Sequence, residues 1–441
     1  MDKFFFDLLK GSEMEQVILY FTRAHLTRDF NDIKNAYVLL NKILQDFKNG
    51  TYTEDSNYSV GCGFIYLLRN NFIEGNEDVI FSSIDEKAFK DVCFRSKESR
   101  TELFSLLHYL ILRTSGNPSQ VNNRILLKNK QLLCQLLDVI GREKRGNTLF
   151  DGRIESILEN LSRSGFARGL IQDILKREHH EKIRLKKIKE KDITFVIPVR
   201  IDCQERIRNL CVLLKQLNKI TGSSVIILEA DSKPRFECKE NNFISYHFIE
   251  DHDPVFYRTK YRNILLSKIK TQIAGVWDTD VVIPGEQIIS SIQDIQKGCI
   301  MSFPYDGRFF SLSPEVSKKY CECLSIQFLM ENIKYYSQDF GTYSTGGAFL
   351  VNKDEYLKCG GENEHFYGWG PEDIERVKRI EILGFDIQRT EGPLFHLHHP
   401  RFSWFDNENT EVNNRTEFIK ICNMTRKELC DNMKTWKTSR M

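Results

Sequence analysis

The sequence lacks the features that mark exported, membrane-spanning or fibrous proteins. Asp7 and Lys10 interrupt its first apolar run, which is too short and too charged for a signal-peptide core. No stretch approaches the ~18 apolar residues needed to cross a bilayer, so we expect no transmembrane segment. Proline is scarce, at 10 of 441 residues, and collagen-like or low-complexity repeats are absent. These absences predict a soluble globular protein.

An excess of charge of one sign is also missing. The chain has 63 Lys and Arg against 61 Asp and Glu, a formal net charge of +2. This balance gives no electrostatic basis for binding nucleic acid or membrane surfaces, so we expect no nucleic-acid partner. The 12 cysteines form no C-x-x-C pair, which argues against a zinc finger or a disulfide framework. Unpatterned thiols without an export signal predict a cytoplasmic location.

The length and the hydrophobic pattern divide the chain. At roughly 150 residues per domain, 441 residues allow two or three domains. Apolar residues recur at helical spacing over 1–175, which predicts an all-α accessory domain. Residues 176–192 contain eight Lys or Arg and four Asp or Glu, and we interpret them as a charged helical linker. From residue 193 short apolar strands alternate with helices, which predicts an α/β domain around a largely parallel sheet over 193–405. We expect a helical tail over 406–441.

Three motifs in the second half contain residues suited to chemistry. Asp278 and Asp280 follow the apolar strand 273–277, where the strands of an α/β sheet end and ligands bind. Two carboxylates at this spacing can hold Mn²⁺ or Mg²⁺. A polar exit from a strand explains the same residues, so this motif alone is a weak signal.

The second motif is GWGPED, residues 368–373. Two glycines flank Trp369, whose flat ring suits stacking on a sugar, and Pro371 favours the start of a helix. Glu372 and Asp373 would then lie in the positive first turn, where a carboxylate can accept a proton from a hydroxyl. A capped surface helix with a buried tryptophan explains the acids but not the glycines.

The third motif is an apolar strand that ends in three histidines, His396, His398 and His399. Several imidazoles at one strand end are candidate metal ligands. On a continuing strand His396 and His398 would share a face, and His399 would point elsewhere. The H-E-x-x-H pattern of zinc hydrolases is absent.

Together the motifs resemble glycosyltransferases of the A-type fold, a Rossmann-like nucleotide-diphospho-sugar transferase fold, and in particular the beta-1,4-galactosyltransferase group. The similarity runs in order through five segments of residues 193–402. They are 195–200 (FVIPVR), 261–266 (YRNILL), 278–280 (DTD), 344–348 (STGGA) and 368–373 (GWGPED). The resemblance implies a metal-dependent inverting transfer of a hexose, galactose or N-acetylgalactosamine, from a UDP-sugar to the hydroxyl of a glycan, peptide or other acceptor.

The resemblance also implies roles for individual residues. Asp280 and His399 would bind Mn²⁺ (or Mg²⁺), and His396 falls where the animal enzymes have a methionine ligand. Asp373 would be the general base, Glu372 a partner of the sugar, and Trp369 a wall between donor and acceptor. Residues implied in donor binding are Pro198, Arg200, Asp202, Glu229 or Asp231, Arg262, Asp278, Gly346 and Gly347.

Departures from the family pattern leave the substrates open. Pro371 replaces the second glycine of G-W-G-G, and Ile374 replaces an acid of the E-D-D-D run. The absence of a membrane anchor favours a bacterial, cytoplasmic enzyme. Two alternatives remain: an amino-sugar transferase like the chondroitin polymerases, and a non-catalytic nucleotide-binding scaffold. The presence of both acid motifs and the histidines argues against the scaffold.

Overall fold

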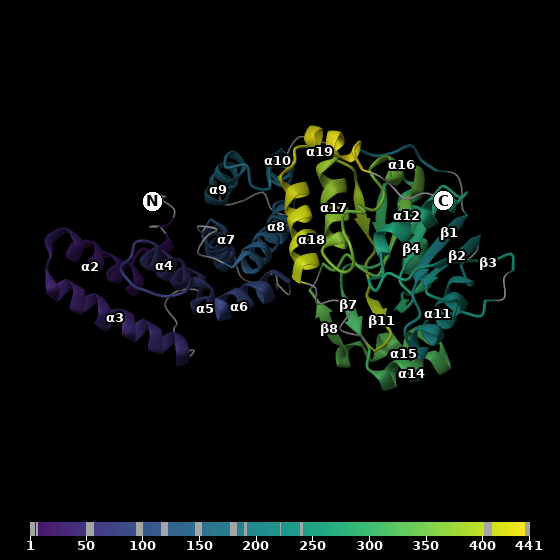
Figure 1. Cartoon of the computed structure of the whole chain (residues 1–441), viewed down its shortest axis with the longest axis horizontal. Coiled ribbons are helices and arrows are strands. Elements are labelled where there is room, and N and C mark those ends of the chain that lie inside the picture. Colours follow the sequence, from purple (N-terminus) through teal and green to yellow (C-terminus); the bar gives the residue numbers. More distant parts are fainter. Residues whose placement is uncertain are drawn as a thin grey trace. The chain divides into compact units, whose positions relative to one another are not determined.

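A computed structural model describes most of the chain, and it forms two compact units, Met1–Asn160 and Leu161–Met441 (Figure 1). The described residues are 5, 8–49, 57–93, 100–115, 122–145, 152–176, 183–188, 192–220, 222–238, 241–341, 343–400 and 408–436. No helix among these residues is long and apolar enough to span a membrane.

The first unit consists of helices in its described part, as the sequence predicts. α2 packs against α3 and α4, and α7 packs between α4 and α8. Gly63 of α4 permits the close approach of α2, because a Cβ there would lie 2.2 Å from Met14 Cγ. The helices are α2 (Glu13–Thr27), α3 (Phe30–Asn49), α4 (Asn57–Arg69), α5 (Glu77–Ile80), α6 (Ser82–Cys93), α7 (Arg100–Thr114), α8 (Asn123–Arg145) and α9 (Gly152–Arg163).

The second unit is built on a seven-stranded sheet of order β10-β6-β9-β4-β1-β2-β3. The neighbours of β1 run parallel to it, whereas β9 is antiparallel to both β4 and β6. The fully buried run ITFVIPV forms β1, as expected for a strand covered on both faces. The strands are β1 (Ile193–Val199), β2 (Ser223–Asp231), β3 (Ile244–Glu250), β4 (Ile273–Trp277), β6 (Met301–Phe303), β9 (Ala348–Asn352) and β10 (Ile387–Arg389).

A second, four-stranded sheet has the order β5-β11-β7-β8. The strand β5 (Val281–Val282) begins directly after the DTD motif and pairs antiparallel with β11 (Leu394–His396). The sheet is completed by β7 (Phe309–Ser311) and β8 (Ser337–Phe340).

Helices flank the main sheet, and two of them carry sequence motifs. α12 (Arg258–Lys268) contains the whole YRNILL segment, and α17 (Glu372–Ile382) begins within GWGPED. In Figure 1 α17 lies beside α18, the helix before the last one. The remaining helices of this unit are α10 (Arg168–Lys176), α11 (Gln204–Leu217), α13 (Gly285–Gln296), α14 (Pro314–Cys323), α15 (Ile326–Glu331), η1 (Ile333–Tyr335), α16 (Lys353–Lys358), α18 (Glu408–Asn423) and α19 (Arg426–Met433).

The structure confirms an α/β domain that follows a helical region, and it differs from prediction at the connection. The expected linker helix over 176–192 is wrong for residues 183–188, which form no helix. Ile183 and Leu185 donate backbone hydrogen bonds to Gly384 and Gly298, so tertiary contacts override the local helical preference. α10, expected in the accessory domain, packs against α17 and α18 because its apolar face is buried there.

Candidate functional site

The pairing of β5 with β11 brings Asp280 beside two histidines. His396 lies opposite Val281 in the ladder, and Leu397 N donates to Asp280 O at 2.8 Å. His396 Nε2 is 3.3 Å from Asp280 Oδ1, and His399 Nε2 is 3.1 Å from Oδ2. One ligand atom from each of the three side chains lies within 4.8 Å of the others. The arrangement therefore brings together the three residues predicted as metal ligands.

The charges around Asp280 suit a cation. Burial opposes ionisation, but His396 and His399 hold the pKa of Asp280 well below its usual range. The side chain of Arg206 on α11 donates from Nη1 to Asp280 Oδ2 at 3.3 Å and from Nε to Asp202 at 2.7 Å. A carboxylate with two imidazoles is a donor set that accepts Mn²⁺ and related divalent ions.

His398 takes no part in this cluster. β11 ends at His396, so the strand alternation expected for His396 and His398 stops there, and the chain turns His399 toward Asp280. The backbone of His398 instead accepts from Arg208 and Asn209 and donates to Ser317. The facing expected on a continuing strand therefore does not apply, and His396 and His399 are the two histidines that lie beside Asp280.

Asp278, the first acid of DTD, faces a different set of partners. β4 and β9 are antiparallel, with Trp277 opposite Ala348, and Asp278 N donates to Gly347 O at 2.9 Å. Its Oδ1 accepts from Arg262 Nη2 at 3.1 Å. The three-residue turn therefore directs Asp280 toward the histidines and Asp278 toward an arginine.

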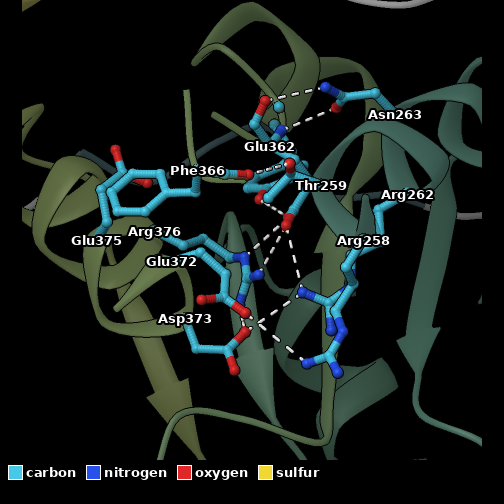
Figure 2. A network of polar contacts seen from close by, with 12 residues as sticks. Arg258, Thr259, Arg262, Asn263, Glu362, Phe366, Glu372, Asp373, Glu375 and Arg376 are labelled. Carbon is cyan, nitrogen blue, oxygen red and sulfur yellow. Dashed lines mark hydrogen bonds and ion pairs between the residues drawn. The ribbon is translucent and has the colours of Figure 1, made fainter. Parts of the chain in front are cut away.

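Glu372 and Asp373 open α17 on the other side of that arginine (Figure 2). Asp373 Oδ1 accepts from Arg262 Nη1 at 3.3 Å and from Arg376 Nη1 at 3.0 Å. Burial raises the pKa of Asp373, but Arg376, Arg262 and Arg258 outweigh it and lower that pKa below its ordinary value.

The pKa of Glu372 is shifted in the opposite direction from that of Asp373. It is 3% exposed, its Oε2 lacks a hydrogen-bond partner, and Arg258 Nη1 is 3.7 Å from Oε1. Burial, with the charge of Asp373 beside it, raises the pKa of Glu372 to about 7. Adjacent carboxyls whose pKa values are pushed apart are a common basis for acid–base chemistry.

Trp369 precedes α17, and Gly346 lies close to Asp373. Trp369 is 57% exposed, so the predicted alternative of a core tryptophan is wrong. Its backbone oxygen accepts from Asn414 of α18 at 3.1 Å, which fixes the loop. A Cβ added at Gly346 would lie 2.9 Å from Asp373 Oδ2, so the glycine leaves that oxygen uncovered.

The residues implied in nucleotide binding lie at the carboxyl ends of β1 and β2. Arg200 donates to Ala230 O at 2.9 Å and pairs with Asp251 at 2.7 Å. Glu229 is fully buried and accepts from two backbone amides and from Tyr246, so it shapes the loop after β2. The positions at these strand ends are Pro198 in β1, Asp202 beyond it, and Glu229 and Asp231 in β2.

Sequence reasoning missed Arg206, Arg258, Glu362 and Arg376. Glu362 is 2% exposed and lies between Arg262 and Arg376. The position of Arg376 was open to prediction, since it lies one helical turn after Asp373. Glu362 carries no such signal, because its partners come from α12 and α17.

Comparisons with known proteins place a family match on the second half of the chain. Residues 328–400 match the model of a family described as the N-terminal domain of galactosyltransferase. Beta-1,4-galactosyltransferase 7 of mouse and of human are each 29% identical to this chain over 122 residues. The alignment covers 26% of this chain and 32% of each relative, so the chain matches about a third of their length.

Solved structures give only distant matches. The catalytic domain of Drosophila beta-1,4-galactosyltransferase 7 in complex with xylobiose has a TM-score of 0.31 and 15% identity, over 51% of this chain and 83% of that chain. GalNAc-T7 with UDP, GalNAc and Mn²⁺ has a TM-score of 0.37 and 13% identity, over 62% and 57%. Both TM-scores are too low to support an argument.

The matched family segment includes GWGPED and the histidines at the end of β11, while DTD precedes it. The resemblance stated from the motifs is therefore confirmed at this level. Over residues 328–400 this chain is similar to the galactosyltransferases, through the segment that contains Glu372, Asp373, His396 and His399.

Proposed function

We propose that the second unit is a glycosyltransferase of the A type that moves a hexose from a UDP-sugar to an acceptor hydroxyl with inversion. The observation that supports this most directly is the division of the DTD turn. Asp280 belongs to a candidate metal cluster, and Asp278 is linked through Arg262 to Asp373. The candidate metal ligand Asp280 and the acid that Arg262 links to the candidate base are thus two residues apart on one turn.

The donor set fits a divalent cation. Asp280, His396 and His399 would hold Mn²⁺, or Mg²⁺, and a metal ion there would stabilise the negative charge that develops on the departing UDP. Of these two ions Mn²⁺ fits the residues better, because two of the three ligands are imidazole nitrogens and Mg²⁺ takes oxygen ligands.

Asp373 would accept the proton that the acceptor hydroxyl loses. Asp373 is ionised at neutral pH, and its Oδ2 is free to accept the proton of the acceptor hydroxyl. The hydroxyl oxygen then forms a bond to the anomeric carbon while the bond from that carbon to the phosphate oxygen breaks, and UDP leaves with the electron pair. Attack from the face opposite UDP inverts the configuration. Glu372, with its pKa raised to about 7, can donate a hydrogen bond to a sugar hydroxyl when protonated.

We favour galactose or N-acetylgalactosamine as the transferred sugar, because of the family match. Trp369, exposed beside Asp373, would stack on the acceptor sugar. Pro198, Arg200, Asp202, Asp231, Gly346 and Gly347 would surround the nucleotide and donor, and the buried Glu229 would hold the loop after β2 in place.

The test is Mn²⁺-dependent release of UDP from UDP-Gal, UDP-Glc, UDP-GalNAc and UDP-GlcNAc. We compare the wild type with Asp280→Ala and Asp373→Asn. Release from one sugar that requires Mn²⁺ and Asp280, and that falls at least about 100-fold in Asp373→Asn, supports the proposal. Release from both amino sugars, UDP-GalNAc and UDP-GlcNAc, and from neither UDP-Gal nor UDP-Glc favours the chondroitin-polymerase-like alternative. Binding of UDP without release from any sugar, across a panel of glycan and peptide acceptors, favours the scaffold, and absence of UDP binding contradicts the proposal.

A further inference from the structure

Glu362 is an acid at the centre of the arginine network in Figure 2 that has no part in the function proposed above. Its side chain is 1% exposed. Oε1 accepts from Tyr356 at 2.5 Å and from Arg376 Nε at 2.8 Å, and Oε2 accepts from Arg376 Nη2 at 2.7 Å and Arg262 Nη1 at 3.4 Å. Arg376 and Arg262 outweigh the effect of burial and lower the pKa of Glu362 to about 2. It is therefore a permanent anion.

The two arginines that hold Glu362 also hold Asp373. Arg262 places Nη1 3.4 Å from Glu362 Oε2 and 3.3 Å from Asp373 Oδ1, so a single nitrogen serves both acids. Arg376 divides its nitrogens: Nε and Nη2 donate to Glu362, and Nη1 donates to Asp373. The planar guanidinium fixes these donors in one geometry, which a lysine cannot reproduce.

The ring of Phe349 on β9 helps to fix both guanidiniums. The Cζ of Arg376 is 4.1 Å from the ring centroid and that of Arg262 is 5.9 Å from it. Each arginine is 1% exposed, so neither can turn toward solvent. Glu362 is thus the acid that competes with Asp373 for these two positive charges.

We propose that Glu362 is a positioning residue: by sharing Arg262 and Arg376 it orients Asp373 and limits how far the two arginines weaken it as a proton acceptor. The proposal rests on the proposed function, in which Asp373 is the base. Without the negative charge of Glu362, both guanidiniums act more strongly on Asp373, while Arg262 keeps its contact with Asp278. The proton affinity of Asp373 then falls, so its carboxylate accepts the hydroxyl proton less readily.

A matched control is present on the same helix. Glu375 and Arg379 form an ion pair of 2.9 Å with side chains 1% and 0% exposed, as buried as the Glu362 pair. Within the described residues neither of them makes a hydrogen bond or ion pair to Asp373. Loss of either pair perturbs folding in a similar way, but only loss of Glu362 should alter Asp373.

The experiment measures UDP release against pH for wild type, Glu362→Gln and Glu375→Gln, in the full chain with Mn²⁺ and the active donor. We expect Glu362→Gln to lower kcat at least about tenfold at neutral pH and to move the acid limb of the profile to lower pH by about half a unit or more. Glu375→Gln should keep the acid limb of the wild type. An unchanged acid limb in Glu362→Gln, or equal shifts in both variants, overturns the proposal.

A second variant covers the case in which Glu362→Gln fails to fold. Arg376→Lys keeps the positive charge near Glu362 but removes the fork that reaches both acids. Since Asp373 then loses a donor, we expect the acid limb to move to higher pH, the opposite direction. An acid limb unchanged in Arg376→Lys overturns the proposal.

Direct titration separates this proposal from the proposed function. Carboxyl ¹³C shifts of selectively labelled aspartate, with Asp373 assigned from Asp373→Asn, report its titration without turnover. A lower titration midpoint of Asp373 in Glu362→Gln supports the coupling even in a protein that releases no UDP, and the proposed function alone then fails. An unmoved midpoint in an active enzyme overturns the positioning role alone.

Discussion

The two acids of the DTD turn enter two different electrostatic environments. Asp280 is the single carboxylate of a cluster whose other members are two imidazoles and the guanidinium of Arg206. Asp278 joins a network of acids and arginines that neutralise one another. The members of that network are Asp278, Glu362, Glu372, Asp373, Arg258, Arg262 and Arg376.

The contrast shows why the histidine cluster suits a metal ion and the arginine network suits proton transfer. The histidine cluster offers one carboxylate and two imidazoles as ligands, so a divalent cation that displaces the guanidinium of Arg206 adds favourable interactions. The arginine network already contains its cations, and a metal ion there would meet repulsion. What the network provides is fixed charge around Asp373 and Glu372, which sets their proton affinities.

The largest expected effect comes from substituting the two acids of the DTD turn one at a time. Asp280→Asn removes the charged ligand from the histidine cluster, and we expect Mn²⁺ affinity to fall about 100-fold or more. Asp278→Asn leaves that cluster intact, so affinity should stay within about tenfold of wild type. Titration of free Mn²⁺ by electron paramagnetic resonance measures both. Equal losses of Mn²⁺ affinity in the two variants would show that Asp278 and Asp280 bind the same ion. That result would contradict the division of the two acids between two environments.

An intermediate effect is expected at Glu372, the poorly paired acid of the arginine network. Its pKa rises from about 4.3 in the unfolded chain to about 7, so the folded protein loses stability as pH rises between these values. Glu372→Gln should therefore be more stable than wild type by about 1–3 kcal/mol at pH 8, and equal to it at pH 4. Urea unfolding without metal or nucleotide measures this.

Asp373→Asn is the matched control for that measurement. The pKa of Asp373 is lowered in the fold, so its carboxylate contributes stability that is present at neutral pH and lost as pH falls. The variant should be less stable than wild type at pH 8, the reverse of Glu372→Gln. A loss of stability in both variants at pH 8 would show that the two acids are equally well paired.

The smallest effect is expected from Arg206→Ala. The guanidinium pairs with Asp280 at 3.3 Å and is 20% exposed, so it competes modestly with a bound cation. We expect Mn²⁺ to bind about threefold to fivefold more tightly without nucleotide, as measured by calorimetry. Arg208→Ala, on the same helix but bonded to Asn209 and His398, should leave affinity unchanged. Weaker binding in Arg206→Ala would show that Arg206 supports the site instead.

Much of the site could be predicted from local sequence. Strand 273–277 ends in DTD as expected, and Pro371 precedes a helix that begins with Glu372 and Asp373. Hydrophobic periodicity and helix-start residues are local properties, so these elements follow from the order of residues alone.

Partners that come from distant elements could not be predicted. Glu362 precedes α17 in an ordinary glycine-rich turn, and only the fold places it between Arg262 of α12 and Arg376 of α17. Arg206 is a polar residue on an amphipathic helix, and its contact with Asp280 spans 74 positions of the chain. Residues 183–188 resemble a charged helix, yet they form a non-helical segment bonded to Gly298 and Gly384.

The sequence by itself determined the order of strands and helices, the acids at the end of β4 and the start of α17, and the histidines at the end of β11. The tertiary structure decided how these groups share charge. Antiparallel pairing of β5 with β11 made His396 and His399 neighbours of Asp280, while α12 placed Arg262 between Asp278 and Asp373. The physical reason is that ionisation depends on burial and on charges within a few ångströms, and those neighbours come from elements far apart in the chain.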